Sequence, residues 1–248
     1  MLPLSRLPRR AEAPEAPAAT FRIGSAIPTL RSVRLLLLSV AVVLLSACSS
    51  TPLKHVVLGP DYQVSNVFRL SSGLPQGFRR VALLPLAIDP ALEEAPTARQ
   101  TLEPILLTEL LKTKRFDVVR VSPEKLQQWS GRSHWSAEDK LPPDFLTKLN
   151  EETGCDGILF AELSRYRPYP PLALGWKLKL VAEPKGLTLW SVDELFDAGE
   201  ARVVNSARRY ENEHLKAGPS TDSPMILASP QRFGQYTLSS LLETLPTP

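Results

Sequence analysis

The chain has 248 residues, of which 43% are hydrophobic and 22% are charged, and its formal net charge at pH 7 is +3. Six of its 29 basic residues but only two of its 26 acidic residues precede Cys48, so the net charge of the rest of the chain is close to −1. Proteins that bind nucleic acids need a clustered cationic surface to neutralise phosphates, so this composition argues against a nucleic-acid partner. The length after Cys48 predicts one domain with tails.

Residues 1–47 have the pattern of a secretory signal peptide. An apolar run from Leu35 to Ala47 follows Arg31 and Arg34, and its thirteen residues include only two polar ones, both serine. As a helix this run is roughly 20 Å long, which is too short for the ~30 Å hydrocarbon core of a membrane. A basic start, a short apolar run and small residues at its end indicate a cleaved signal, not a membrane anchor.

The residues Leu45-Ser46-Ala47-Cys48 resemble the lipobox of bacterial lipoproteins. The resemblance implies that the signal peptidase recognises Leu45, Ser46 and Ala47, and that Cys48 carries a covalent lipid and becomes the new N-terminus. Several acyl chains would anchor the protein firmly in a membrane. Ser49 follows the cysteine, which by the sorting rule of these lipoproteins implies the periplasmic face of the outer membrane, with the inner membrane as the alternative. An uncleaved apolar helix with an incidental cysteine is the competing interpretation.

The segment before the apolar run is unusually long for a signal peptide. It has 34 residues, five of which are proline, and the next methionine after Met1 is Met225. We interpret its first part as an extension that arises from a start codon assigned too far upstream. Initiation near Leu30 or Val33 would leave a signal of ordinary length.

Residues 48–78 predict a tether between the lipidated cysteine and a folded domain at residues 79–248. A short strand within residues 62–70 is a further expectation. The first strand of the domain is the apolar run 79–86, which is typical of a strand buried on both faces. A helix over residues 98–114 follows, with Thr97 or Thr101 as its N-cap, and Pro104 favours the start at Thr101, because proline is tolerated only in the first turn.

The rest of the domain alternates between strands and helices. Ser122-Pro123 and Gly154 have the residue types of helix ends, so they bound the predicted helices 123–129 and 144–153. The remaining predicted elements are strands 116–121, 157–163, 175–182 and 187–192 and helices 200–213 and 229–245. The order β-α-β-α-α-β-β-β-α-α predicts an α/β fold with a mixed sheet, helices packed on it and a helical C-terminus.

The strand 175–182 has two different faces. Trp176 and Leu178 alternate with Lys177 and Lys179, so the sequence predicts a buried face and a solvated face. Lysines on the outer face are a common protection of an edge strand. We expect Trp176 and Trp190 to pack in the core.

Four stretches of the chain together resemble a known group of envelope proteins. They are RRVALLPL, LLKTKRFDVVRVSPEKL, GCDGILFAELSRY and WKLKLVAEPKGLTLWSVDE. Their order over residues 79–215 is similar to that in lipoproteins with a TolB N-terminal-like, or anticodon-binding-like, α/β domain, the group of CsgG, PelC and LpoB. The resemblance implies a non-enzymatic, periplasm-facing lipoprotein whose domain binds or scaffolds a partner in secretion, polysaccharide-export or cell-wall machinery. A ring-forming collar or a subunit of an outer-membrane export apparatus is the alternative.

The chain shows no residue constellation that is typical of an enzyme. His55, His134 and His214 have no metal-ligand spacing, and no phosphate loop or nucleophile elbow occurs. We therefore expect no catalytic residue, no metal and no cofactor other than the lipid, and we expect solvated histidines. With Cys48 lipidated, Cys155 has no partner for a disulfide, and we expect it to be buried and inert.

The segment from Arg165 to Pro171 is the candidate partner-binding loop. Arg165, Tyr166, Arg167 and Tyr169 are of residue types enriched in binding hot spots, and three prolines stiffen the backbone that carries them. The prolines also predict that the chain between Leu163 and Trp176 is not paired in a hairpin, which argues against a membrane-crossing one. The competing interpretation is a stiff connector.

Overall fold

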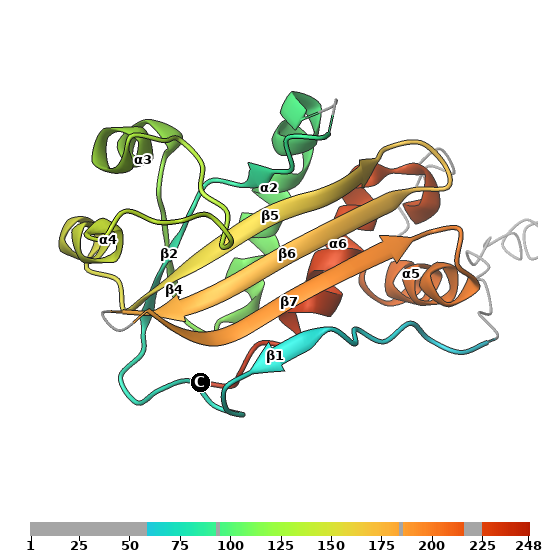
Figure 1. Ribbon diagram of the computed structural model, residues 1–248. Helices are drawn as coiled ribbons and strands as arrows, with labels where there is room; N and C mark the ends of the chain where they lie inside the picture. The colour runs from blue at the N-terminus through green and yellow to red at the C-terminus, as the bar shows by residue number, and fades with distance from the viewer. Residues whose placement is uncertain (1–58, 93–94, 184–185, 216–224) are drawn as a thin grey trace, which may run out of the picture. The chain divides into compact units, whose positions relative to one another are not determined.

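The strands of the domain form one mixed sheet. The computed structural model describes residues 59–92, 95–183, 186–215 and 225–248, and within them seven strands form a sheet of order β1-β7-β6-β5-β2-β4, with β3 beside β5 (Figure 1). The strands are β1 (Val67–Arg69), β2 (Arg80–Leu83), β3 (Ala87–Ile88), β4 (Asp117–Arg120), β5 (Gly157–Arg167), β6 (Ala173–Ala182) and β7 (Leu187–Asp197). The predicted signal peptide, Leu45, Ser46, Ala47, Cys48 and His55 lie outside the described residues.

The sheet is parallel on one side and antiparallel on the other. Strand β2 is parallel to β4 and to β5, whereas β5, β6, β7 and β1 form antiparallel pairs. Helical segments connect the parallel strands, and short connections join β5 to β6 and β6 to β7, whereas β1 reaches β7 from a distant part of the chain. The predicted α/β class with a mixed sheet, and the predicted order of elements, are confirmed.

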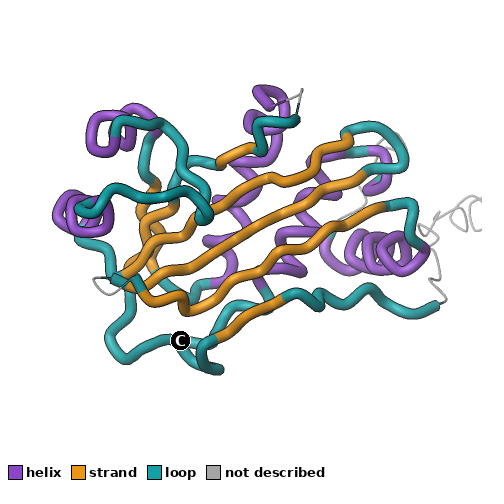
Figure 2. The backbone as a smooth tube through the Cα atoms, viewed as in Figure 1, coloured by secondary structure: helices purple, strands orange, loops and turns teal. Residues whose placement is uncertain are grey.

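Helices cover one face of the sheet fully and the other face only in part. The helices are α2 (Ala95–Thr113), α3 (Pro123–Ser130), α4 (Phe145–Thr153), α5 (Ala201–His214) and α6 (Pro230–Leu242), with a 3₁₀ turn η1 (Ile226–Ala228). Helices α2, α5 and α6 pack on the face that holds Trp176 and Trp190, both fully buried as expected. Helices α3 and α4 pack on the opposite face, over β2 and the first half of β5. The front of β6 and β7 carries no helix (Figures 1 and 2).

Capping residues act as the sequence predicts, with one exception at α2. The hydroxyl of Ser122 accepts a hydrogen bond from the Lys125 amide at 3.3 Å, and Gly154 ends α4 with a φ of +61°. Helix α2 begins earlier than expected, at Ala95, so Pro104 lies in its interior. The expected start at Thr101 is therefore wrong. Pro104 and Gln100 are both exposed, so water can satisfy the carbonyl that lacks its helical partner.

Residues 59–78 lie against the domain and are not a free tether along this part. The Tyr62 ring packs 5.1 Å from the Phe196 ring, and its hydroxyl donates to Glu194 Oε1 at 2.5 Å. The amides of Ser65 and Asn66 donate to the other oxygen of the same carboxylate. The strand expected within residues 62–70 is confirmed as β1, which pairs with β7.

The three antiparallel strands extend further than the sequence predicts. Pairing of β5 with β6 runs from Gly157–Ala182 to Arg167–Ala173, with one irregularity between Leu163 and Arg165, so only residues 168–172 form the turn between the two strands. The expectation that the prolines prevent pairing between Leu163 and Trp176 is wrong, because all three lie in this turn and interrupt no ladder bond. The argument against a membrane-crossing hairpin loses its basis. Among the described helices, none has the length and hydropathy to traverse a membrane.

Candidate functional site

The predicted binding residues Arg165, Tyr166, Arg167 and Tyr169 do not form one loop. Arg165 to Arg167 belong to β5, and only Tyr169 lies in the turn, where it is 69% exposed. Tyr166 packs against the helix-covered core. Arg167 ion-pairs with Asp197 at 2.7 Å and donates to the Pro171 carbonyl, so it ties the turn to the end of β7.

A broader surface, which we call the open face, replaces this loop as the candidate site. It consists of the side chains of β1 and β5–β7 that point away from α2 and α6. Cross-strand register places them in rows: Arg165–Gly175–Leu195, then Glu162–Lys177–Asp193, then Lys179–Ser191–Phe68. Residues opposite each other in antiparallel strands share a face, so each row lies on one side of the sheet.

Gly175 allows the close approach of β5 at the end of the open face. A Cβ at this position would lie 2.6 Å from Ser164 Oγ and 2.9 Å from Arg165 Cβ, where the pairing of β5 with β6 is irregular. A larger residue would collide with this bulge. The short distance also confirms that Arg165 and Gly175 lie on the same face of the sheet.

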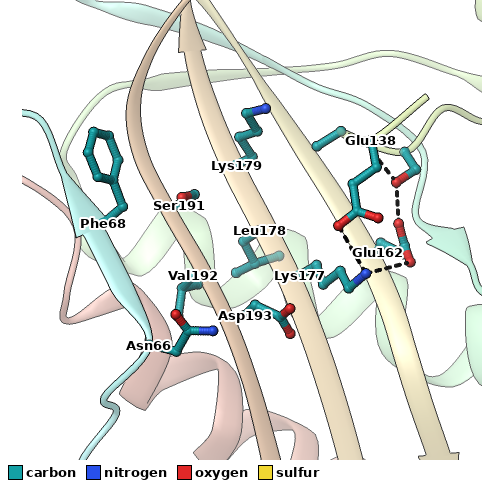
Figure 3. A pocket seen from close by; sticks show the side chains of 12 residues that line it. Asn66, Phe68, Glu138, Glu162, Lys177, Leu178, Lys179, Ser191, Val192 and Asp193 are labelled. Atoms are coloured by element: carbon teal, nitrogen blue, oxygen red, sulfur yellow. Dashed lines mark hydrogen bonds and ion pairs between the residues drawn. The ribbon is translucent and has the colours of Figure 1, made fainter. Parts of the chain in front are cut away.

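An ion-pair network occupies one side of the open face. Lys177 Nζ lies 3.0 Å from Glu138 Oε1 and 4.0 Å from Glu162 Oε1 (Figure 3). The Ser136 hydroxyl donates to the second oxygen of Glu162. The hydrogen bond to Glu138, and then the charge of Glu162, raise the pKa of Lys177, which stabilises the protonated form of this amine.

The loop between α3 and α4 forms a wall beside this network. Trp135 is buried, donates from Nε1 to Ser130 Oγ at 2.7 Å and packs 5.4 Å from the Phe145 ring. The Arg132 guanidinium lies 4.4 Å from the centre of the indole. Because Trp135 fixes the loop, Ser136 and the residues after it stand over β5 and β6 (Figure 2).

A shallow cavity of about 230 Å³ lies between this wall and β1. Asn66 and Phe68 line it on the β1 side, and Lys179, Ser191 and Asp193 form its floor (Figure 3). Phe68 is 49% exposed, as is Leu195 at the end of the face. The open face thus combines exposed apolar side chains with charges of both signs, which is typical of an interaction surface.

Of the described residues, His134, His214 and Cys155 take no part in this surface. His134 is half-buried, not solvated as expected, because its loop packs on the domain, and burial lowers the pKa of its ring. His214 is exposed and stacks on Tyr210 with ring centres 4.6 Å apart. Cys155 is fully buried, as predicted, and burial raises the pKa of its thiol. Within the described ranges, no group of three or more His, Cys, Asp or Glu side chains could hold a metal ion.

Sequence reasoning found the two lysines of the open face but assigned them the wrong role. Lys177 and Lys179 were expected to protect an edge, yet β6 lies between β5 and β7 in the sheet. Their alternation with Trp176 and Leu178 correctly indicates the solvated face. Glu138, Ser136 and Phe68 were missed, because loops and a three-residue strand bring them to this face from distant parts of the chain.

The fold and this surface define an α/β protein with one sheet face closed by helices and the other half open. No protein-family model matches the chain, and no curated protein matches it. Its fold is similar to that of solved envelope proteins. A PelC dodecamer structure from Paraburkholderia phytofirmans is 14% identical, with a TM-score of 0.39 over 75% of this chain and 97% of that one.

Two further solved structures are similar over shorter spans. Lipoprotein GNA1162 from Neisseria meningitidis is 13% identical, with a TM-score of 0.36 over 55% of this chain and 99% of that one. The LpoB C-terminal domain from Salmonella enterica is 18% identical, with a TM-score of 0.32 over 48% of this chain and 83% of that one. The structural neighbours thus include PelC and LpoB, two members of the group that the sequence resembles.

Proposed function

We propose that this chain is a lipid-anchored protein of the bacterial envelope that binds another envelope protein through the open face of its sheet. The lipobox-like residues Leu45–Cys48 support the anchor and the envelope location, and the open face supports the binding role. The proposal places the domain on the periplasmic side of the outer membrane. Its partner would belong to secretion, polysaccharide-export or cell-wall machinery.

The observation that carries the binding role is the exposed pair Phe68 and Leu195 beside charged side chains on an uncovered sheet. Each of these two side chains is 49% exposed, although both lie on regular strands. Exposed apolar side chains on a rigid sheet lose little conformational entropy when a partner covers them. A protein that binds through this face would gain their burial.

Binding, and not catalysis, is the activity that the charged groups of this face support. A catalytic lysine needs a lowered pKa, whereas two carboxylates raise the pKa of Lys177. Glu162 is held by Ser136 and faces Lys177, so neither carboxylate oxygen is placed to act as a base. Such paired charges position a loop and set specificity for a partner.

A ring-forming collar of an export apparatus is the second candidate function. Both edge strands, β4 and β1, are open on one side within the described sheet, and each is short. Copies that join β4 of one to β1 of the next would form a head-to-tail assembly, which closes into a ring when the rotation permits. The mass of the assembly in solution distinguishes this candidate from a binary complex.

The anchor is tested by replacing Cys48 with serine. We expect the Cys48→Ser protein to leave the membrane fraction or to accumulate as an uncleaved precursor, because the acylated thiol is absent. Cell fractionation with immunoblotting measures this, and Cys155→Ser is the matched control. Membrane association at the normal mature size in the Cys48→Ser protein would contradict the anchor.

The binding role is tested by photocrosslinking in intact cells. A photoreactive phenylalanine at position 68 or 195 should give a discrete crosslinked product, because both side chains lie on the open face. The same residue at Arg208, an exposed position of α5, is the control. Crosslinked products of equal intensity at all three positions, or no crosslinked product at positions 68 and 195, would contradict the binding role.

A further inference from the structure

Two oppositely charged side chains on the open face have no hydrogen-bond or ion-pair partner within the described part of the chain. Lys179 lies half-buried on β6, and Asp193 lies exposed on β7. The neighbouring Lys177, by contrast, is held by Glu138 and Glu162 (Figure 3). An accessible lysine and an exposed aspartate this close together would be expected to find partners across an interface.

We propose that two copies of this chain pair through their open faces about a two-fold axis, so that Lys179 of each copy binds Asp193 of the other. This inference rests on the proposed binding role of the open face, and it names a second copy of the chain, in place of a different envelope protein, as the occupant of that face. A two-fold contact is self-complementary, so each copy must present both halves of every pair. The open face does so with Lys179 and Asp193, for which the described residues provide no hydrogen-bond or ion-pair partner, whereas the further cation Arg165 lies at the end of the face, away from both.

The register of the strands fixes where such an axis would lie. Lys179 is opposite Ser191, and Lys177 is opposite Asp193, so Lys179 and Asp193 are diagonal neighbours on adjacent strands. On a regular sheet, strands are about 4.8 Å apart, and residues on the same face of one strand are about 6.6 Å apart. A two-fold axis that places Lys179 of one copy over Asp193 of the other must lie in the plane between the two sheets. This axis crosses the strands obliquely and runs toward β1.

This axis passes close to Phe68. Phe68 is opposite Ser191, in the same row as Lys179 and two strands away from it. With the regular strand and residue spacings given above, the axis passes within about 2 Å of the position of Phe68. The Phe68 rings of the two copies would therefore meet across the axis, which buries a side chain that is 49% exposed in the single chain.

The reach of the side chains fits the separation of packed sheets. Two sheets that pack face to face are about 10 Å apart, a distance that an extended lysine and an aspartate together span. The opposed faces would bring together two Lys179–Asp193 pairs, and the two phenylalanines would meet farther along the axis, on the β1 side of these pairs. Leu195 lies at the far end of the same face, where the partner's α3–α4 wall can cover it.

The area of the open face predicts a reversible pair. About seven residues on each of β5, β6 and β7 and the three residues of β1, at about 4.8 Å by ~3.3 Å per residue, give a footprint of roughly 380 Å² per copy, or about 760 Å² in total. Interfaces of this size belong to transient complexes. The contact also closes at two copies, whereas the ring of the second candidate function needs edge-to-edge contacts.

The test is a charge exchange in the full-length protein, measured by sedimentation equilibrium in a density-matched detergent. Lys179→Glu and Asp193→Lys should each weaken the dimer about tenfold or more, because each variant places like charges opposite each other. An equimolar mixture of the two variants should recover pairing, since the introduced glutamate of one variant would then face the introduced lysine of the other, and the native lysine would face the native aspartate. Arg208→Glu, with the same charge change on α5, should leave pairing unchanged, and circular dichroism confirms that all variants fold.

The outcomes separate this inference from the function on which it rests. A mixture that pairs no better than its two components, or an equal loss in Arg208→Glu, would overturn the reciprocal contact. A wild-type protein that stays monomeric while position 68 crosslinks to a different protein would overturn the second copy as occupant and keep the binding face. A monomeric protein that gives no crosslink at positions 68 and 195 would overturn both the pairing of two copies and the binding role of the open face.

Discussion

His134 illustrates how packing changes the chemistry of a single residue. It lies half-buried in the loop between α3 and α4, with Nδ1 2.8 Å from Ser133 Oγ. Its Nε2 is buried and has no hydrogen-bond partner in the described part of the chain. Burial, and then the positive charge of Arg99, lower the pKa of His134 below its usual 6.5. The folded state therefore favours the neutral ring.

This lowered pKa predicts a loss of stability in acid. Between pH 6.5 and the lower pKa of the folded state, the unfolded chain binds more protons than the folded one, so stability falls as the pH falls through this window. We expect His134→Gln to remove this part of the pH dependence. Urea unfolding at about pH 7.5, 6.5 and 5.5 measures it, with His214→Gln as the control. Parallel pH profiles for the wild type and His134→Gln would contradict the assignment.

Cys155 and His134 show which residue properties the sequence alone could predict. Cys155 follows a helix-ending glycine and precedes an apolar run, and this local pattern correctly predicts its burial. His134 stands among polar residues, so it was expected to be solvated. Its burial depends on how the loop between α3 and α4 packs on the domain, where the charge of Arg99 on α2 acts on its ring. Local spacing carries no information about such contacts.

At the scale of elements, the turn between β5 and β6 depends on Arg167. This side chain is 35% exposed and joins Asp197 at the end of β7, where the Gly199 amide also donates to the same carboxylate oxygen. Arg165, two residues earlier, is exposed and lies on the open face. The two arginines, which the sequence placed in one binding loop, therefore have different roles.

Alanine substitutions separate these roles. Arg167→Ala should destabilise the protein by about 0.5–1 kcal/mol, the range of a partly exposed ion pair with a hydrogen bond. Arg165→Ala should change the unfolding free energy by less than ~0.5 kcal/mol, as surface substitutions usually do. Chemical denaturation of both variants, and of Asp197→Ala alone and with Arg167→Ala, measures the coupling. Equal effects of the two arginine substitutions would show that Arg167 is not a structural contact.

The order of elements was predictable, but the ends of the long strands were not. Proline after serine and glycine after a helical run mark helix ends through backbone geometry, which is local. Strand length depends on whether a neighbouring strand is present to pair. Residues Ser164 to Arg167 extend β5 because residues 173–175 of β6 lie beside them, on the far side of a proline-rich turn. The open face likewise depends on which strands lie side by side, so the sequence alone could not predict it.

At the scale of the whole molecule, residues 59–78 complete the domain. Tyr62, Val64 and Val67 pack against the core that α5, α6 and β7 form. Asp61 ion-pairs with Arg209 of α5 at 2.9 Å. A domain boundary drawn at residue 79 would remove all of these contacts and would uncover Phe196, which is fully buried in the structure.

Two truncated proteins test this boundary. A protein of residues 59–248 should unfold cooperatively, whereas one of residues 79–248 should be less stable by roughly 3 kcal/mol, since it loses the burial of one tyrosine and two valines. Guanidinium unfolding followed by tryptophan fluorescence measures the difference, because Trp190 lies on β7. Identical midpoints for the two proteins would mean that residues 59–78 contribute nothing to the fold.

The C-terminal residues lie beside the first strand, and this proximity constrains the order in which the protein folds. The Leu74 amide donates to the Thr247 carbonyl at 2.7 Å, and the Thr247 hydroxyl donates to the Ser72 carbonyl, 175 residues away along the chain. The β5–β6–β7 meander needs only neighbouring segments, so it can form early, whereas contacts of such long sequence separation form late. Strand β1, and Phe68 with it, pairs with β7 across a separation of about 120 residues, so it joins the sheet after the meander has formed. The open face is therefore completed late, and a chain that has folded only its meander does not present it.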